Sequence, residues 1–135
     1  MELKDRVAIV TGSLGLLGRE HLRALGAAGA SLVVTDADEK KCEGLAKELG
    51  PNAIGVGADV TSRADLERLR DRTIESFGRI DVLVNNAAID DKGPGVRGQG
   101  SAGEFESFPL ESFKKALDVN VTGVFLACQV LGSVM

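Results

Sequence analysis

The sequence of 135 residues contains no tryptophan, no tyrosine, one histidine and two cysteines. The missing tyrosine removes one class of general acid–base residue from the chain. Cys42 and Cys128 lie far apart and neither has a CxxC partner, so the sequence indicates neither a disulfide framework nor a zinc site. We therefore expect two free, buried thiols and a reducing, cytoplasmic compartment. The lone His21 belongs to no carboxylate or thiol cluster and is expected to be a surface or packed residue, not a ligand.

The sequence also lacks an excess of basic residues and a long hydrophobic run. It has 16 Lys and Arg against 20 Asp and Glu, and this balance argues against nucleic acid and anionic membranes as partners. The most apolar segment, 119–135, is interrupted by polar side chains, so a membrane span is not expected. The N-terminus is not followed by the apolar stretch of a signal peptide.

Short apolar segments alternate with helix-forming segments along the first part of the chain. Strands are expected at 6–10, 31–35, 53–57 and 80–84, and helices at 17–28, at 42–49 and after Thr61. The connections are short, which predicts βαβ units: an α/β fold with a parallel sheet and helices on both faces. A glycine-rich loop is expected at 90–103.

A last helix is expected to begin near Leu110, and much of its second half is apolar all round. Such a helix is usually buried or lies in a subunit interface. Asn120 is a polar residue inside this helix, and a buried amide without partners costs roughly 1–3 kcal/mol. A kink, a bound water or a catalytic use would each explain it. The expected apolar stripe consists of Phe113, Leu117, Val121, Val124, Cys128 and Leu131.

The segment TGSLGLLG at 11–18 follows the first expected strand directly and opens a helix. Its glycines, Gly12, Gly15 and Gly18, are spaced GxxGxxG, which suits a tight turn and a close backbone approach because glycine has no Cβ. The helix N-terminus behind them offers unpaired N–H groups to a pyrophosphate. This placement predicts nucleotide binding, and since no Gly-Lys-Ser/Thr follows, the segment is not a P-loop.

An acidic residue, Asp36, follows the second expected strand. Its carboxylate can accept hydrogen bonds from both hydroxyls of an adenosine ribose and would repel a 2′-phosphate. The glycine-rich turn contains no Lys or Arg to receive that phosphate, which favours NAD over NADP. The alternative is that Asp36 caps the next helix, a role for which Asp38 competes.

Two further polar segments follow the third and fourth expected strands. Asp59-Val60 could meet the exocyclic amine of an adenine, or Asp59 could cap a helix, although Thr61 and Ser62 are equally able to do so. The segment Asn85-Asn86-Ala87-Ala88 suits a place where the backbone approaches a ligand closely, and a turn is the alternative.

In this order the segments resemble the short-chain dehydrogenase/reductase superfamily. The resemblance rests on TGxxGxxG, Asp36, Asp59-Val60, NNAA and VNVTG at 119–123, and it runs over residues 1–135. It implies a Rossmann-type, doubly wound parallel sheet whose four strands present here lie in the order 3-2-1-4. It also implies NAD as the cofactor, with NADP less favoured, a small alcohol or carbonyl substrate, and a homo-oligomer.

The resemblance further implies a role for individual residues. Asn120 matches the family's catalytic Asn, which holds a water in the proton relay. The pyrophosphate is assigned to Gly12, Ser13, Gly15, Leu17 and Gly18, the adenosine ribose to Asp36, the adenine to Asp59 and Val60, and the nicotinamide-side ribose to Asn86, Ala87 and Ala88.

The sequence departs from the family pattern in three ways. The middle glycine is Gly15, whereas the commonest spacing places it at the position of Leu16, and Ala88 replaces the last glycine of NNAG. The family's catalytic Ser and Tyr-x-x-x-Lys lie beyond the position of Asn120, and this sequence has no tyrosine. Residues 1–135 are therefore expected to form an incomplete domain, its cofactor-binding half, which holds NAD without turning it over.

Three hypotheses about function follow. The chain is the N-terminal half of an NAD-dependent oxidoreductase, or a dinucleotide-binding module without catalysis, or a member of another Rossmann-like class such as a methyltransferase. The NNAA and VNVTG segments count against the third hypothesis.

The expected strand order leaves the apolar strand 80–84 at an open edge, which favours aggregation. We therefore predict that the 135-residue chain by itself is marginally stable and poorly soluble. Solubility and a thermal melt measure this, and a soluble monomer with a sharp transition near that of complete family members would contradict it.

Overall fold

The computed structural model describes residues 2–90 and 105–135. The first part alternates strands and helices: β1 (Val7–Thr11), α1 (Leu16–Ala27), β2 (Ser31–Asp36), α2 (Glu39–Leu49), β3 (Ala53–Gly57), α3 (Arg63–Phe77) and β4 (Val82–Val84). The second part is helical: a 3-10 turn (Phe105–Ser107), α4 (Leu110–Leu117), a π-helical turn (Asp118–Thr122) and α5 (Gly123–Gly132). The loop expected at 90–103 lies, apart from its first residue, outside the described residues.

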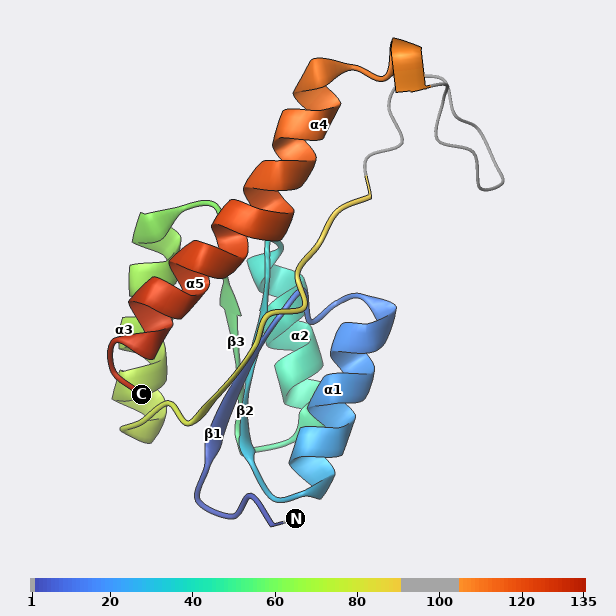
Figure 1. The fold of residues 1–135 in the computed structure, drawn as a ribbon. Helices are drawn as coiled ribbons and strands as arrows, with labels where there is room; N and C mark the ends of the chain where they lie inside the picture. Colours follow the sequence, from blue (N-terminus) through green and yellow to red (C-terminus); the bar gives the residue numbers. More distant parts are fainter. Residues whose placement is uncertain (1, 91–104) are drawn as a thin grey trace.

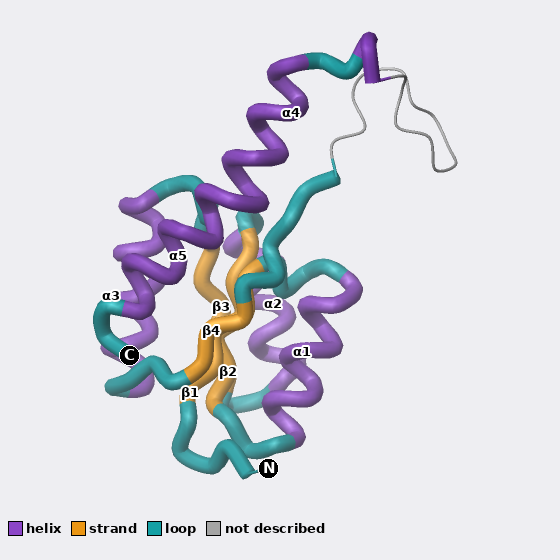
Figure 2. The backbone as a smooth tube through the Cα atoms, viewed as in Figure 1, coloured by secondary structure: helices purple, strands orange, loops and turns teal. Residues whose placement is uncertain are grey.

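The four strands form one parallel sheet in the order β3-β2-β1-β4, as predicted. Helices α1 and α2 cover one face, and α3 and α5 cover the other, while α4 extends beyond the sheet (Figure 1; Figure 2). This is the α/β, doubly wound arrangement expected from the sequence. All strands point the same way, so their carboxyl ends meet at one edge of the sheet.

The strands are apolar on both sides because both faces of the sheet are covered. Alternate residues of β1 enter different cores: Ile9 packs toward α3 and α5, and Val10 packs toward α1 and α2. The buried residues of the α3 and α5 side are Val7, Ile9, Val33, Val56, Ala58, Leu66, Leu69, Ile80, Ala127, Val130 and Leu131. Those of the α1 and α2 side are Ala8, Val10, Leu22, Ala30, Leu32, Val34, Cys42, Leu45 and Ala46.

The helix ends use residues that the sequence analysis had weighed. Asp38 is the N-cap of α2 and accepts a hydrogen bond from the Lys41 amide, so the capping alternative for Asp36 is wrong. Ser62 is the N-cap of α3 and accepts from the Asp65 amide. Gly78 ends α3 in the left-handed conformation.

The predicted apolar stripe of the last helix is confirmed at Leu131, is half-buried at Val124 and is wrong at its other members. The buried residues are Gly123, Ala127, Val130 and Leu131, whereas Phe113, Leu117, Val121 and Phe125 are exposed. The buried face continues the half-buried positions Ala116 and Val119 at intervals of three or four residues. It carries small residues where the helix packs closely, since a Cβ at Gly123 would lie 2.7 Å from the Val60 side chain. No residue of α4 is buried.

The prediction of two free, buried thiols holds for one of them. Cys42 is buried, and this burial, together with the nearby Asp36 carboxylate, raises the pKa of the Cys42 thiol to about 11. Cys128 is exposed, because α5 packs inward through Gly123, Ala127, Val130 and Leu131. His21 is exposed on α1. None of the helices in the described ranges is long and apolar enough to cross a membrane.

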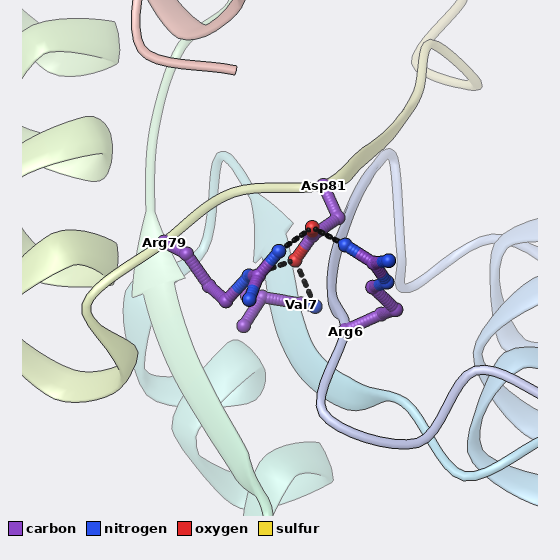
Figure 3. A network of polar contacts seen from close by, with 4 residues as sticks. All are labelled: Arg6, Val7, Arg79 and Asp81. Atoms are coloured by element: carbon purple, nitrogen blue, oxygen red, sulfur yellow. Dashed lines mark hydrogen bonds and ion pairs between the residues drawn. The ribbon is translucent and has the colours of Figure 1, made fainter.

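At the amino-terminal end of the sheet, the Asp81 side chain binds the Val7 backbone and two arginines (Figure 3). Its carboxylate accepts hydrogen bonds from the Val7 amide at 2.9 Å, from Arg6 at 2.9 Å and from Arg79 at 2.6 and 2.8 Å. The Asp81 amide in turn donates to the Val7 carbonyl at 2.9 Å. This pairing joins β1 to the chain just before β4, which begins at Val82 and not at residue 80 as predicted.

Hydrogen bonds from Arg79, and then from the Val7 amide and Arg6, hold the pKa of the Asp81 carboxyl well below its ordinary value, although partial burial opposes them. Because the folded pKa is depressed, the stabilisation is present above the unfolded pKa of about 4 and is lost as the pH falls toward the folded value. Both arginines are about half exposed, so solvent screens their share of it.

We predict that Asp81→Asn lowers the free energy of unfolding at pH 7 by roughly 1–2 kcal/mol, because it removes charge-assisted hydrogen bonds. Below pH 4 the difference between the variant and the wild type shrinks. Urea unfolding between pH 3 and 7 measures both effects. Asp71→Asn, which alters an exposed ion pair with Arg70, is the control and is expected to change little; an equal loss in both variants would contradict the role of Asp81.

Candidate functional site

A cleft with a volume of about 1030 Å³ lies at the carboxyl ends of the strands. This edge of a parallel sheet is where doubly wound folds bind ligands. The cleft is lined by the glycine-rich turn, the end of β2, the segment after β3, the segment after β4, and the π-helical turn. The lining residues are Gly12, Gly15, Leu16, Leu17, Thr35, Asp36, Ala37, Ala58, Asp59, Val60, Asn86, Ala87, Ala88, Ile89, Asp90 and Val119.

The glycine-rich turn brings two segments into close contact. Gly12 has a φ of +63°, and a Cβ at this position would lie 2.7 Å from the Ala87 Cα. A Cβ at Gly18 would lie 2.3 Å from the Gly12 carbonyl oxygen and 2.7 Å from the Ser13 Cα. At Gly15 the nearest atom would be 3.4 Å away, an ordinary contact. Steric exclusion therefore requires the first and third glycines and not the middle one.

Helix α1 presents its N-terminus to the cleft. Gly15 is the N-cap, and no side chain caps this end. The N–H groups of the first turn have no carbonyl partner within the helix, and together with the helix dipole they form an anion-binding position. Leu16 and Leu17 beside them are 89% and 68% exposed and line the cleft.

A set of hydrogen bonds joins the glycine-rich turn to the NNAA segment. The buried Thr11 hydroxyl donates to the Val84 carbonyl at 3.4 Å and accepts from the Asn86 and Ala87 amides, each at 3.0 Å. The Asn86 side-chain amide donates to the carbonyls of Thr11 and Gly12, both at 3.0 Å. Asn86 therefore positions the backbone around the cleft. Sequence reasoning missed Thr11, for which its place as a polar residue ending an apolar strand was the available signal.

Ser13 has a structural role that the sequence did not reveal. Its hydroxyl donates to the Val10 carbonyl at 2.5 Å and accepts from the Thr35 amide at 3.1 Å, and its own amide donates to the Thr35 carbonyl at 3.1 Å. Ser13 is fully buried and is not among the residues that line the cleft. It holds the turn against β2.

The Asp36 carboxylate is held in place at the end of β2. One oxygen accepts from the Leu14 amide at 3.2 Å, and the other accepts from the Ala37 amide at 2.8 Å. Both oxygens keep lone pairs that can accept further hydrogen bonds. Asp36 is half-buried and lines the cleft, so the carboxylate is fixed beside the glycine-rich turn.

The segment after β3 places Asp59 and Val60 at the same cleft. The Asp59 carboxylate accepts from the Thr61 amide at 2.9 Å and from the Thr61 hydroxyl at 2.7 Å. Because Ser62 caps α3, the proposed capping role of Asp59 is wrong. The segment after β4 runs past the cleft without a turn at residues 85–90, so the turn alternative for NNAA is wrong as well.

Asn120 lies on the π-helical turn and uses its side chain on the backbone. Its Oδ1 accepts from the Ile89 amide at 2.8 Å, and its Nδ2 donates to the Ile89 carbonyl at 3.0 Å. The expectation of a buried amide is wrong, because Asn120 is exposed. The side chain instead fastens the last helix to the segment after β4 and brings Val119 to the cleft.

The cleft therefore gathers nine of the twelve residues that the sequence singled out: Gly12, Gly15, Leu17, Asp36, Asp59, Val60, Asn86, Ala87 and Ala88. Ser13, Gly18 and Asn120 do not line the cleft, but they contact the segments that do. Sequence reasoning missed Leu16, Thr35, Ala37, Ala58, Ile89, Asp90 and Val119 as lining residues. Within the described residues the cleft carries three carboxylates and no Lys or Arg.

The sequence profile of the family described as "short chain dehydrogenase" matches residues 6–135. The galactitol 2-dehydrogenase of Agrobacterium fabrum is 32% identical over 135 residues, which are 100% of this chain and 49% of that enzyme. The 3-alpha-(or 20-beta)-hydroxysteroid dehydrogenase of Mycobacterium bovis is 36% identical over 124 residues, covering 92% of this chain and 44% of that enzyme. The chain spans about half the length of the curated relatives it matches.

Solved structures are similar over the same extent. The 3-ketoacyl-(acyl-carrier-protein) reductase of Brucella melitensis complexed with NADH has a TM-score of 0.83 and 32% identity, covering 96% of this chain and 50% of that one. A glucose/ribitol dehydrogenase of the short-chain type from Brucella melitensis has a TM-score of 0.85 and 29% identity, covering 99% of this chain and 54% of that one.

We predict that Gly12→Ala and Gly18→Ala each destabilise the fold by at least about 2 kcal/mol, whereas Gly15→Ala costs about 1 kcal/mol or less. The first two substitutions place a Cβ within 3 Å of backbone atoms, and at position 12 the alanine is also strained by the positive φ. At position 15 alanine replaces a glycine N-cap without a clash. Urea unfolding of the three variants gives the ranking. An equal cost at all three positions would show that the close approach around Gly12 is not what requires glycine.

Proposed function

This chain belongs to the short-chain dehydrogenase family, and we propose that it supplies the nicotinamide-dinucleotide site of an oxidoreductase acting on an alcohol or carbonyl substrate. One observation carries the proposal: a single cleft combines an open helix N-terminus, a fixed carboxylate and small residues where a ligand must approach closely. The cofactor, when bound, supplies hydride transfer at its nicotinamide ring. The chain's own residues bind and orient it.

The pyrophosphate would bind at the N-terminus of α1. Its negative charge is matched by the first-turn N–H groups and by the helix dipole, since the described lining residues include no Lys or Arg. Gly12 and Gly18 allow the turn to lie close to the helix, and Leu17 contributes apolar contact. Ser13 supports this turn from the core and makes no side-chain contact of its own with the cleft.

Asp36 would bind the adenosine ribose and select NAD over NADP. Its carboxylate is already oriented by the Leu14 and Ala37 amides, so few degrees of freedom are lost when the ribose hydroxyls donate to it. A 2′-phosphate at the same place would meet a negative charge with no basic lining residue in the described part of the cleft. The NADH bound to the reductase of Brucella melitensis is consistent with this choice.

The remaining contacts follow the length of the cleft. Asp59 and Val60 would meet the adenine, and Ala87 and Ala88 would leave room for the nicotinamide-side ribose. Asn120, through its bonds to Ile89, would hold this wall of the cleft in place. We keep the assignment of Asn120 as a relay residue as a proposal. Because its side chain is already bonded to Ile89, its backbone would hold the relay water.

A non-catalytic dinucleotide-binding module is the second candidate for these 135 residues taken by themselves, which contain no tyrosine. The family's proton transfer uses a tyrosine as general acid–base. We propose that residues 1–135 form an incomplete domain, which by itself holds the cofactor without turnover, in a reducing, cytoplasmic compartment. The exposed stripe of Phe113, Leu117, Val121 and Phe125 supports the proposal of a homo-oligomer.

Calorimetric titration tests the site. We predict that Asp36→Ala weakens NAD binding by roughly 10- to 100-fold, because charge-assisted hydrogen bonds of about 1.5–3 kcal/mol are lost, and reduces the preference for NAD over NADP. Asp38→Asn is the matched control: it removes a neighbouring charge, keeps a residue that can cap α2, and should leave affinity unchanged. Undiminished NAD affinity in Asp36→Ala rejects the ribose assignment.

A further inference from the structure

Thr35, the residue before Asp36 at the end of β2, carries an unexplained polar group in the wall of the cleft. It is 1% exposed and lines the cleft, and its hydroxyl has no hydrogen-bond partner in the part of the chain that the structure describes. Buried hydroxyls are nearly always partnered, because an unpaired one destabilises the folded state. An exception in a cleft therefore asks for a functional reason.

The backbone of Thr35 cannot supply that reason. Its amide donates to the Ser13 hydroxyl at 3.1 Å, and its carbonyl accepts from the Ser13 amide at 3.1 Å. Both main-chain groups are thus used within the fold. The hydroxyl is the one polar group that Thr35 has left to offer a ligand.

Thr11 provides an internal comparison. It pairs with Thr35 in the register of β1 and β2, ends its own strand, and is 2% exposed. The Thr11 hydroxyl nevertheless makes three hydrogen bonds, to the Val84 carbonyl and from the Asn86 and Ala87 amides. Two neighbouring threonines with equal burial thus differ completely in whether the protein satisfies their hydroxyls.

The position of Thr35 indicates which part of a ligand it would meet. It is followed by Asp36 and Ala37, and the Ala58 amide donates to the Asp36 carbonyl at 2.9 Å, so β2 and the segment after β3 meet here. Asp36, Ala58, Asp59 and Val60 line the same end of the cleft. This is the end to which the proposed function assigns the adenosine.

We propose that Thr35 is a further cofactor-binding residue, whose hydroxyl makes a hydrogen bond with the adenosine moiety of the bound dinucleotide. The inference rests on the proposed function and adds a contact to it. A hydroxyl both donates and accepts, and the ring nitrogens and ribose oxygens of adenosine offer the complementary groups. The adenosine would thus provide the hydrogen-bond partner that the Thr35 hydroxyl lacks within the described fold.

The test compares Thr35→Val, Thr35→Ser and Thr11→Val with the wild-type 135-residue chain. Valine keeps the shape of threonine without its hydroxyl, and serine keeps the hydroxyl. Thermal unfolding without ligand is measured first, followed by titration with NAD and with ADP-ribose, which lacks the nicotinamide. Thr11→Val is the control for the loss of a satisfied hydroxyl and should lower the Tm.

We expect Thr35→Val to show an unchanged or higher Tm and roughly 3- to 10-fold weaker binding of both NAD and ADP-ribose, the loss of one hydrogen bond. Thr35→Ser should bind within about twofold of the wild type. Wild-type affinity in Thr35→Val overturns the inference and leaves the proposed function intact. A lower Tm in Thr35→Val, or a loss confined to NAD, also overturns it, by showing a structural role or a contact elsewhere. Failure of the wild type to bind NAD overturns the proposed function itself.

Discussion

The Gly12 backbone passes so close to Ala87 that a Cβ at position 12 would lie 2.7 Å from the Ala87 Cα. Hydrogen bonds between the same two segments, made by the Thr11 hydroxyl and the Asn86 side chain, stabilise this contact. It joins the turn after β1 to the segment after β4, both of which line the cleft. The position of the α1 N-terminus depends on it, because Gly18 packs against the same Gly12 carbonyl.

The protein satisfies its polar groups thoroughly in its interior and leaves several unsatisfied in the cleft. Ser13, Thr11 and Asp81 have their hydrogen bonds completed within the chain. The first-turn amides of α1 and the Thr35 hydroxyl lack partners within the described fold, and the Asp36 carboxylate keeps free lone pairs. A dinucleotide complements these groups in kind: anionic oxygens for amides, and hydroxyls for a carboxylate. The cost to stability is concentrated where binding can offset it.

The π-helical turn at Asp118–Thr122 joins the last helix to the cleft. It places the Asn120 amide against the Ile89 peptide, which fastens the wall of the cleft to the helix. Directly after it, the small residues Gly123 and Ala127 pack inward, while Phe113 and Phe125 are exposed. One irregular turn thus links the geometry of the cleft to an exposed apolar stripe.

The sequence by itself determined the α/β class, because strand and helix periodicity are local properties of the chain. Its resemblance to a known family supplied the strand order and nine residues that line the cleft. It could not show that Ser13 faces the core or that Thr11 and Thr35 differ, since both threonines end apolar strands. It also misassigned the last helix, because apolar residues lie at helical spacing on more than one face of it and the pattern does not say which face packs inward. Those outcomes depend on which groups meet across separate segments, and only the tertiary packing decides that.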